Sequence, residues 1–559
     1  MKLSTIPQLY RHVGRWTEII AVLSKYGLAD WLSRFDLEYT KGLFKARDGE
    51  ALARLSREAR IRMVLTDLGP TFIKLGQILS TRPDLIGVGL ANELQGLLVN
   101  VPPDSPQVVR ATIETELGEP IEDLFAEFDD VAVASASIGQ VHKARLSTGE
   151  LVAVKVQRAG IDEKVRIDMD ILSGLAQLAE MLPELANYRP KATLAEFQRM
   201  LRRELDFGRE ERNIMQFGRD YAETAGVRIP SVYSELCTPR VLTMDWLEGV
   251  SLCAPERLKA LDLDLDDVAQ RGADLYLEMI FKHGVYHADP HPGNILVQEN
   301  GTIGLLDFGM VGRIDEPLRE QIEEMLLALA GQDTQQLSRI VMQLGEMPPG
   351  MDEGALRCDL AEFIGHYGCQ PLGEFQLAAA LTEMIEIIRR YRIMLPASIA
   401  MLLKTLILLE GTGRVIQPHF SLLDAMEPYR KRAVMQRLSP RRRLRKLRSI
   451  ARDIERLVEI FPRRMIDILG QVQSGKFDMH LDHRGLEPSV NRLVLGLLTS
   501  SLFVGSSLML SQKVWPLLYL FDGQISVLGA LGCMMSFILG LRLIRAINKS
   551  GHLDRKGRD

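Results

Sequence analysis

The residues best suited to chemistry lie in the segment HADPHPGN, residues 287–294, and shortly after it. Asp289 precedes Asn294 by five residues, and Asp307 of an Asp-Phe-Gly sequence follows thirteen residues later. A carboxylate in such a loop can orient or deprotonate an attacking hydroxyl, while carboxylate and amide oxygens are suitable ligands for Mg²⁺. Asp-Phe-Gly alone occurs often by chance, but the loop, a short apolar strand and the second aspartate in series specifically predict phosphoryl transfer.

A lysine within an apolar strand is the second chemical feature. Lys155 ends the run Val-Ala-Val-Lys, and a buried ammonium is costly unless it meets an anion. The predicted helix 191–220 offers four candidate partners: Glu204, Asp206, Glu210 and Glu211. Taken alone, these features also fit an edge-strand lysine and a solvated acidic helix face. Together with the loop and Asp-Phe-Gly, they follow the order of a protein-kinase fold.

The segment before this strand departs from the glycine-rich loop with which kinases cover nucleotide phosphates. It contains nine residues that we expect to bind the nucleotide: Val133, Ala134, Ser135, Ala136, Ser137, Ile138, Gly139, Gln140 and Val141. Gly139 is its single glycine, and alanine restricts the positive φ conformations that glycine permits. We therefore predict a stiffer loop. The Ala-Pro-Glu sequence of protein kinases is also missing after Asp-Phe-Gly, which argues against a platform for peptide substrates.

Several motifs together resemble those of one known family. They are Lys74-Leu75-Gly76-Gln77, the alanine-rich loop, Glu204-Leu205-Asp206 followed by Glu210 and Asn213, HADPHPGN and Asp-Phe-Gly. In this order, over residues from about 30 to 430, the chain resembles the UbiB family of atypical kinases, also called aarF-domain-containing kinases. The resemblance implies an α+β, protein-kinase-like fold of two lobes with an added N-terminal helical extension. It also implies a role in ubiquinone biosynthesis.

The resemblance assigns roles to the chemical residues, with ATP and Mg²⁺ as cofactors. Lys155 would contact the ATP phosphates and pair with Glu210. Asp289 would be the catalytic aspartate of the loop. Asn294 and Asp307 would bind Mg²⁺.

The resemblance also implies a hinge and a regulatory group. The hinge, from Met244 to Leu247, would lie near the adenine ring. The expected regulatory residues are Lys74, Gln77, Glu204 and Asp206. Lys74 would reach Glu204 and so block the place where a peptide would lie. The alternative is a kinked helix in which Gly76 serves packing alone.

Periodicity predicts the elements that must position these residues. A β-hairpin is predicted over 141–156, with its turn at Ser147-Thr148-Gly149. The other predicted elements are helices over 52–82, 161–183 and 191–220 and strands over 227–233 and 240–245. After Asp264 the chain should be largely helical to about residue 412, interrupted by the loop 284–294 and two strands near 295–306. This pattern predicts a small β-rich lobe followed by a larger helical lobe.

Two apolar runs near the C-terminus, 493–510 and 525–541, are long enough to cross a membrane when flanking residues extend them. More Lys and Arg residues flank the pair than lie between the runs, so the positive-inside rule places both ends in the cytoplasm. A buried helical hairpin in a soluble core is the alternative. We expect a multi-pass protein of the bacterial inner (cytoplasmic) membrane, with its catalytic domain in the cytoplasm.

Charge is concentrated in one place. Residues 430–448 include ten Lys or Arg and no Asp or Glu, although the whole chain has a net charge of −5. A basic cluster beside membrane spans favours contact with anionic lipid head groups, with a solvated helix face as the alternative. The rest of the chain is acidic, so nucleic acid is not an expected partner.

Composition sets the class and the domain organisation. The 559 residues are 46% hydrophobic and 25% charged, as in a folded protein of several domains. Five scattered cysteines without a CxxC pair predict neither disulfides nor structural zinc. We predict a helical extension (1–105), an N-lobe (106–247), a C-lobe (248–430), a basic juxtamembrane linker (431–489) and two transmembrane helices (490–547).

Three functions fit these motifs. The first is a membrane-anchored ATP-binding kinase or ATPase that supports biosynthesis of a prenylated quinone, with quinone precursors or quinone-biosynthesis enzymes as partners. The others are a phosphotransferase acting on a small molecule or lipid, and a nucleotide-gated scaffold. Homodimerisation is left open. A quinone-ring hydroxylase is excluded, because the sequence has neither a dinucleotide-binding glycine motif nor a two-His–carboxylate set on plausible elements.

Overall fold

A computed structural model describes residues 12–28, 55–97, 102–180, 189–330, 332–348, 350–368, 376–429, 486–520 and 523–549. The chain forms two compact units, Met1–Arg443 and Leu444–Asp559. The first unit holds every predicted site residue, and the second holds the two apolar runs. The basic segment 430–448 and residues 431–485 of the predicted linker lie outside the described residues.

Helices dominate the described part of the N-terminal extension. They are α2 (Val13–Lys25), α4 (Arg57–Leu68), α5 (Pro70–Ser80), α6 (Pro83–Ile86) and α7 (Val88–Gln95). The segment 52–82, predicted to be helical, forms two helices rather than one: α4 ends at Leu68, Gly69 follows with φ of 92°, and Pro70 begins α5. Glycine adopts this φ at little cost, and proline suits a first helical turn. Buried Leu65 and Phe72 give these helices a core of their own.

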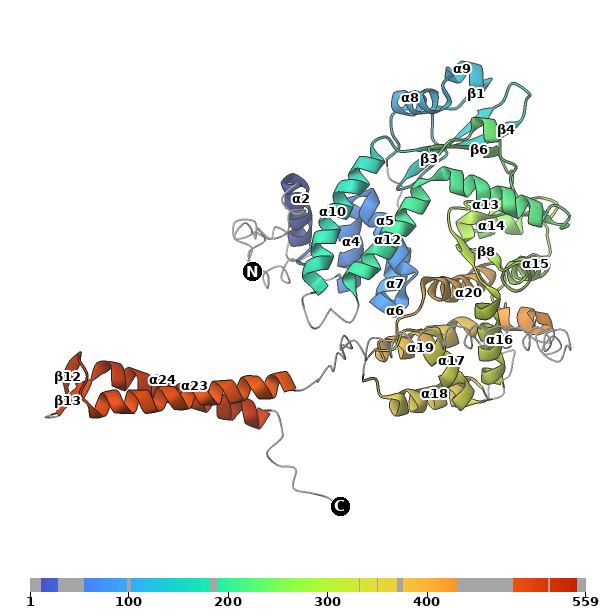
Figure 1. The fold of residues 1–559 in the computed structure, drawn as a ribbon. Helices are drawn as coiled ribbons and strands as arrows, with labels where there is room; N and C mark the ends of the chain where they lie inside the picture. The colour runs from blue at the N-terminus through green and yellow to red at the C-terminus, as the bar shows by residue number, and fades with distance from the viewer. Residues whose placement is uncertain are drawn as a thin grey trace, which may run out of the picture. The chain divides into compact units, whose positions relative to one another are not determined.

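An antiparallel sheet forms the smaller lobe (Figure 1), in the order β1-β3-β4-β6 with β2 also paired to β3. Its members are β1 (Glu127–Phe128), β2 (Ala134–Ser135), β3 (Gly139–Arg145), β4 (Leu151–Gln157) and β6 (Val241–Asp245), with α8 (Pro106–Leu117) and α9 (Ile121–Leu124) beside them. The predicted hairpin 141–156 is confirmed as β3–β4, in which Val141 lies opposite Lys155. Val152 and Val154 are buried in the core of this lobe. Alternation along β4 therefore places Lys155 on the opposite face.

The helical pattern after the sheet contains a break that periodicity did not reveal. The helices are α10 (Ile161–Glu180), α12 (Pro190–Leu205) and α13 (Phe207–Asp220). The helix predicted over 191–220 is interrupted at Asp206, whose carboxylate accepts a hydrogen bond from the Gly208 backbone N–H at 3.1 Å and caps α13. Aspartate is among the preferred residues for such a cap. The break puts Glu204 and Glu210 on different helices.

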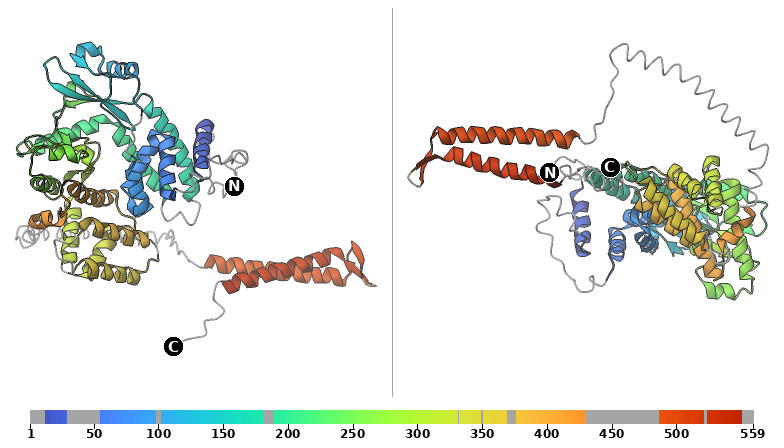
Figure 2. Two further views of the ribbon diagram at one scale, coloured as in Figure 1. Left: turned by 180° about the vertical axis from the view of Figure 1, so that it is seen from behind. Right: turned by 90° about the horizontal axis from the view of Figure 1, so that it is seen from below.

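The larger lobe is mainly helical and lies at the opposite end of the first unit from the sheet (Figures 1 and 2). Its helices are α14 (Pro255–Lys259), α15 (Leu265–Glu278), α16 (Glu316–Ala330), α17 (Thr334–Leu344), α18 (Glu353–Tyr367), α19 (Leu377–Arg390) and α20 (Ala397–Ile416). Short helical turns span Ser234–Leu236, Met279–His283 and Pro292–Asn294.

Short strands connect the two lobes. They are β5 (Val227–Arg228), β7 (Val250–Ser251), β9 (Ile295–Val297) and β10 (Ile303–Leu305), in the order β5-β10-β9-β7. A separate pair joins β8 (Val285–His287) to β11 (Val311–Arg313). Of the strand predicted over 227–233, only the first two residues form a strand, which is β5. These strands hold the ends of the loop that carries Asp289.

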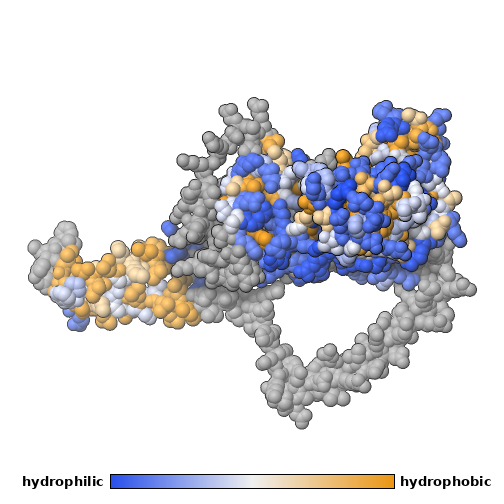
Figure 3. Space-filling view, turned by 90° about the horizontal axis from the view of Figure 1, so that it is seen from above, coloured by the Kyte–Doolittle hydropathy of each residue, from blue (hydrophilic) through white to orange (hydrophobic). Residues whose placement is uncertain are grey.

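The second unit is a hairpin of α23 (Leu486–Ser511) and α24 (Val527–Lys549), joined through β12 (Leu517–Leu520) and β13 (Gly523–Ser526). The helical segments Arg492–Ser511 and Val527–Arg545 have mean hydropathies of 1.9 and 2.0, and only 6% and 11% of their most apolar windows are buried. Hydrophobic residues cover most of this hairpin in Figure 3. Both helices are therefore long and apolar enough to cross a membrane, and their apolar side chains face outward rather than into a protein core.

Candidate active site

Lys155 and Glu210 form a buried ion pair between the sheet and α13. The Lys155 ammonium lies 2.7 and 2.9 Å from the two carboxylate oxygens of Glu210, and the side chains are 14% and 4% exposed. Burial alone would lower the pKa of Lys155, but the carboxylates of Asp307 and Glu210 outweigh it and raise that pKa. The lysine is therefore charged throughout the physiological range.

The loop that carries Asp289 is fixed by His287, which is fully buried. His287 Nε2 lies 2.9 Å from the Leu306 carbonyl oxygen and 3.0 Å from that of Asp307. Because both partners are acceptors, this nitrogen carries the proton, which leaves Nδ1 free to accept from the Asp289 backbone N–H at 3.4 Å. One imidazole thus joins the loop to the Asp-Phe-Gly turn.

Asn294 orients Asp289 directly. Its side-chain amide donates to the Asp289 carboxylate at 3.1 Å and to the Asp289 backbone carbonyl at 3.2 Å. These bonds use the amide nitrogen of Asn294 and leave its oxygen available to a cation. Spacing within one loop therefore brings together the predicted catalytic residue and one predicted magnesium ligand.

Helix α20 supports this loop from behind, through contacts that the sequence did not predict. Thr405 Oγ1 donates to the Ala288 carbonyl at 3.0 Å, and Thr412 Oγ1 donates to the Pro290 carbonyl at 2.7 Å. Both threonines are buried. Asp289 lies between the two carbonyl groups in the chain, so its backbone is held on each side.

Asp307 lies in the left-handed region of backbone conformation, with φ of 54°. Non-glycine residues in this region are strained and cluster at functional sites. Its Oδ1 accepts from the Gly309 backbone N–H at 3.2 Å and lies 3.5 Å from the Lys155 ammonium. The positive charge of Lys155 lowers the pKa of Asp307 well below its ordinary value, although burial opposes the shift. The Lys155 charge therefore keeps the Asp307 carboxylate ionised, and this side chain, which is 54% exposed, is accessible from the cavity.

The phenylalanine of the same turn connects Asp307 to α13. Phe308 is fully buried, and its ring centroid lies 5.1 Å from that of Phe217 and 5.3 Å from that of His287. Asn213 on α13 donates its side-chain amide to the Phe308 carbonyl at 2.9 Å. The helix that carries Glu210 is thus fastened to the turn that carries Asp307.

The alanine-rich loop is a tight hairpin of β2 and β3. Arg158 fastens it: the guanidinium donates to the Ala136 carbonyl at 2.9 Å, to Ser135 Oγ at 2.7 Å and to the Asp104 carboxylate at 3.0 Å. The Ala136 N–H bonds to the Gly139 carbonyl at 2.8 Å. The loop is therefore bound to the segment before α8.

Two residues of this loop do not reach the cavity. Ser135 is engaged by Arg158, and the Gln140 amide group is buried between His142, at 2.7 Å, and the Asp104 backbone N–H, at 2.8 Å. Strand alternation turns them away from the face that the other loop residues line. A Cβ atom at Gly139 would lie 2.9 Å from the Val156 carbonyl oxygen, so close approach rather than positive φ explains this glycine.

The N-terminal extension contributes Lys74 from α5. Its ammonium forms an ion pair with Glu204 at the end of α12, and the two side chains are 15% and 9% exposed. Burial lowers the pKa of Lys74, while the Asp307 carboxylate acts in the opposite direction. Gln77, one turn later, donates to the Leu97 carbonyl at 3.0 Å. Asp206 caps α13 instead and does not line the cavity.

These residues surround one cavity of about 600 Å³. The predicted residues that line it are Lys74, Gln77, Val133, Ala134, Ala136, Ser137, Ile138, Gly139, Val141, Lys155, Glu204, Glu210, Met244, Leu247, Asp289, Asn294 and Asp307. Trp246, within the expected hinge from Met244 to Leu247, also lines it, as do Ser80, Lys404 and Leu408, which the sequence did not single out. The side-chain oxygens of Asn294 and Asp307 are donors of the kind that Mg²⁺ prefers, so the residues present fit this metal.

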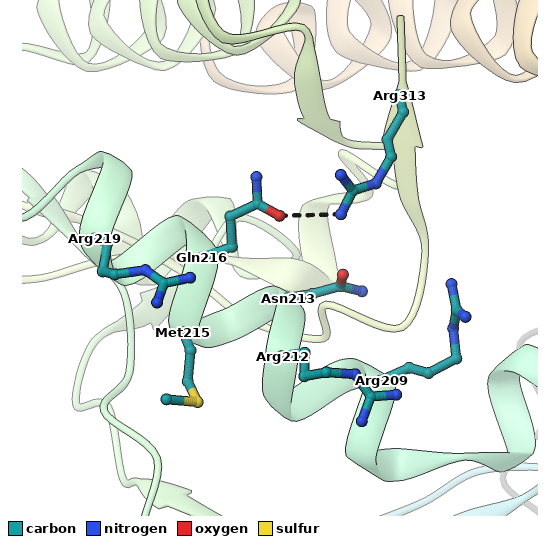
Figure 4. Close-up of a pocket in the computed structure, with 7 residues that line it drawn as sticks. All are labelled: Arg209, Arg212, Asn213, Met215, Gln216, Arg219 and Arg313. Carbon is teal, nitrogen blue, oxygen red and sulfur yellow. Dashed lines mark hydrogen bonds between the residues drawn. The ribbon is translucent and has the colours of Figure 1, made fainter.

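A second cavity, of about 570 Å³, lies along α13 and β11 (Figure 4). Its lining residues are Arg209, Arg212, Asn213, Met215, Gln216, Arg219 and Arg313. Arg313 donates to the Gln216 side-chain oxygen at 3.0 Å. Burial and the charges of neighbouring arginines lower the pKa of Arg209. The guanidinium groups are exposed, and this cavity contains none of the predicted catalytic residues.

A lysine–glutamate pair, an Asp-x₄-Asn loop and an Asp-Phe-Gly carboxylate around one cavity define a protein-kinase-like site. The chain matches the ABC1 atypical kinase-like domain over residues 96–341, the UbiB helical domain over 360–421 and the ABC1/UbiB kinase-like C-terminal domain over 478–549. It belongs to the UbiB/ABC1 family of atypical kinases.

Similar proteins extend over most of the chain. An uncharacterized protein from the hydrogenase 1 5′ region of Clostridium pasteurianum is 30% identical over 97% of this chain and 100% of its own length. Probable protein kinases UbiB from Pseudomonas paraeruginosa and Pseudomonas aeruginosa are 32% identical over 77% of this chain and 79% of theirs. A solved structure, the Rv3197–erythromycin complex from Mycobacterium tuberculosis, covers 68% of this chain and 97% of that chain with 24% identity and a TM-score of 0.46.

Proposed function

We propose that the protein is an ATP-binding, Mg²⁺-dependent atypical kinase or ATPase. The observation that carries this proposal is the convergence of Lys155, Glu210, Asp289, Asn294 and Asp307 on one cavity. They come from a strand, a helix, a loop and a turn, and each bears the group that phosphoryl transfer requires.

Each residue has a separate task in this proposal. Lys155, held by Glu210, binds the nucleotide phosphates, and the oxygens of Asn294 and Asp307 hold Mg²⁺. Asp289, held by Asn294, orients the attacking hydroxyl or water and accepts its proton. Bound ATP and Mg²⁺ supply the phosphoryl group and the charge that neutralises it.

The acceptor is not expected to be a peptide. Lys74 and Glu204 occupy the side of the cavity that the extension covers, and both side chains are largely buried. The Ala-Pro-Glu sequence of protein kinases is also missing. Water or a small molecule is therefore the favoured acceptor, which keeps ATP hydrolysis and small-molecule or lipid phosphotransfer as the two enzymatic alternatives. A nucleotide-gated scaffold is the third alternative.

We further propose that the hairpin anchors the protein in the bacterial inner membrane and that the catalytic unit supports ubiquinone biosynthesis. The apolar exposed faces of α23 and α24 support the anchor, and the relatives named UbiB support the pathway. A polyprenyl chain is held in the bilayer by ~0.8 kcal/mol per buried CH₂ group. In this proposal, the ATPase lies at the membrane with anionic lipids and quinone precursors as partners. It exposes the head group of the polyprenylated precursor to soluble enzymes.

The test is ATP turnover by the full-length protein in liposomes, with and without quinone-precursor analogues, while the γ-phosphate is followed. Phosphate released to water supports an ATPase, and phosphate on the analogue or a lipid supports a phosphotransferase. Binding of ATP without turnover would favour the scaffold. If the folded protein does not bind ATP in the presence of Mg²⁺, the proposal is wrong.

A further inference from the structure

Lys404 is a third lysine in the cavity, besides Lys74 and Lys155. It lies on α20, and no motif in the sequence pointed to it. This half-buried residue lines the cavity, and both the Asp289 carboxylate and the Lys74 ammonium act on it electrostatically.

Its surroundings distinguish Lys404 from the other two lysines. Lys74 is paired with Glu204, and Lys155 with Glu210 and Asp307. Within the described part of the chain, no carboxylate forms an ion pair with Lys404.

The hydrogen-bond partner of Lys404 is a neutral hydroxyl. Its ammonium donates to Ser80 Oγ at 3.3 Å, and the hydroxyl of Ser80 in turn donates to the Gln77 carbonyl at 2.6 Å. An ammonium has three donors, and a hydroxyl does not neutralise its charge. Burial lowers the pKa of Lys404, with Asp289 opposing the shift. Among the described residues, Lys404 thus has a hydroxyl partner and no ion-paired carboxylate.

The fold fixes the position of this cation. Thr405, the next residue, and Thr412 bond to the carbonyls on either side of Asp289. Ser80, from the extension, is 3% exposed and holds the ammonium from the other side. A charge held in this way needs little reorganisation when a ligand arrives.

We propose that Lys404 binds a phosphate-class oxyanion at the Asp289 end of the cavity. The inference rests on the proposed function and extends it. The oxyanion is either the terminal phosphoryl group of the nucleotide or free inorganic phosphate. A tetrahedral anion beside the Asp289 carboxylate would be repelled by it, and Lys404 supplies the cation that offsets this repulsion. Lys155 and the Mg²⁺ ligands Asn294 and Asp307 remain for the rest of the nucleotide.

The experiment measures ligand binding to full-length protein in detergent. The dissociation constant of Mg²⁺–ADP is determined with and without orthovanadate, which takes the place of the transferring phosphoryl group. The variants are Lys404→Met and Lys404→Arg, with Lys143→Met as a matched control. Lys143 lies on β3, its ammonium is 5.0 Å from the Trp246 ring centroid, and it does not line the cavity.

In the wild type and in Lys143→Met, vanadate should tighten ADP binding. In Lys404→Met, binding of ADP alone should change by less than about twofold, while the tightening by vanadate falls by about tenfold, the effect of losing one charge-assisted hydrogen bond. Lys404→Arg should retain part of the tightening by vanadate. Inorganic phosphate, tested as a competing ligand, identifies the source of the oxyanion. Lys404-dependent binding of phosphate without ADP indicates free phosphate. Lys404-dependent binding that requires ADP indicates the nucleotide's own phosphoryl group. Both results support the site.

A second measurement uses the wild type alone and does not depend on the folding of a variant. Lysine acylation followed by mass spectrometry should show Lys404 protected by ADP with vanadate, compared with ADP alone. The inference is wrong, while the proposed function stands, if the wild type binds ADP but two results are negative. These are that vanadate tightens ADP binding equally in the wild type and in Lys404→Met, and that Lys404 is not protected from acylation. If the wild type binds no nucleotide, the proposed function fails first.

Discussion

At the level of single residues, Lys155 forms ion pairs with two carboxylates at once. Glu210 lies 2.7 Å from its ammonium and Asp307 lies 3.5 Å away. One cation between two acids leaves negative charge in the cavity, and a divalent cation beside Asp307 would compensate for it. This arrangement predicts that metal and nucleotide bind together.

Asp307→Asn should therefore abolish Mg²⁺-dependent ATP binding while the fold is retained, because the amide removes the negative charge that a metal requires. Lys155→Met should weaken ATP binding by at least about tenfold, since a charge-assisted contact to phosphate is lost. Titration calorimetry with Mg²⁺–ATP measures both effects, and circular dichroism confirms folding. Lys143→Met, a lysine on the same sheet outside the cavity, should bind as the wild type does. Unchanged turnover in folded Asp307→Asn protein would contradict the kinase assignment.

The lowered pKa of Asp307 gives a pH dependence of stability. A carboxylate whose pKa is lower in the folded state contributes stability above its unfolded pKa of about 3.9, and this contribution is lost as pH falls through the folded value. Its cause is the Lys155 charge, opposed by burial. The difference in melting temperature between wild type and Asp307→Asn should thus be constant near neutral pH and shrink below about pH 4. A difference that stays constant down to pH 2 would rule out this interaction.

At the scale of elements, Arg158 couples the alanine-rich loop to the segment before α8. Arg158→Met removes the hydrogen bonds to Ala136, Ser135 and Asp104 together, so the loop should open. Amide hydrogen exchange should rise at Ala136, whose N–H bonds to the Gly139 carbonyl, and ATP or ADP affinity should change. Arg166→Met is the control, because Arg166 forms an exposed pair with Glu163 on α10.

A glycine in the same loop offers an independent change. Ala134→Gly or Ala136→Gly opens positive φ conformations, so backbone N–H groups can turn toward phosphates. Nucleotide affinity or preference should shift, and phosphate incorporation into the protein itself should rise. If exchange and nucleotide affinities match the wild type in the arginine and glycine variants alike, the loop does not restrain the site.

The docking of α5 on α12 depends on the Lys74–Glu204 pair. Lys74→Met leaves Glu204 buried without its partner, which typically costs about 3–5 kcal/mol, whereas the double variant Lys74→Met/Glu204→Gln should recover part of that loss. Chemical denaturation of the four proteins of this cycle measures the coupling. Radiolabel incorporation should also rise in Lys74→Met if the pair blocks access to the cavity. If the losses of unfolding free energy are additive, the pair does not stabilise the docking of α5 on α12. If radiolabel incorporation does not rise in Lys74→Met, the pair does not block access to the cavity.

At the scale of the whole molecule, the catalytic cavity and the apolar hairpin belong to separate compact units. Deletion of residues 490–559 should release the protein from the membrane fraction and leave ATP binding intact, since the cavity residues all lie in the first unit. Membrane fractionation and nucleotide binding of the truncated chain test this. Insolubility of the truncated chain, together with detergent-free solubility of the full-length protein, would instead identify the hairpin as part of a protein core.

Features that depend on local spacing could be predicted from the amino-acid sequence. The β3–β4 hairpin follows from two β-rich runs around a Ser-Thr-Gly turn, and strand alternation then fixes the face of Lys155. Asp289 and Asn294 are five residues apart in one loop, so their contact needs little long-range information. Local patterns could not locate the break at Asp206, because the helical periodicity continues through a residue that also caps helices well.

The distant residues that complete the site became apparent from the packing of the folded chain. Lys404, Ser80 and Arg158 carry no motif, and their roles come from contacts between segments that lie 22 to 324 residues apart in the chain. Ser135 and Gln140 belong to the expected loop, yet their side chains are used by Arg158 and His142. A sequence pattern reports the conformations that neighbouring residues prefer, whereas the packing of buried side chains and the pairing of buried charges determine which polar groups face the cavity.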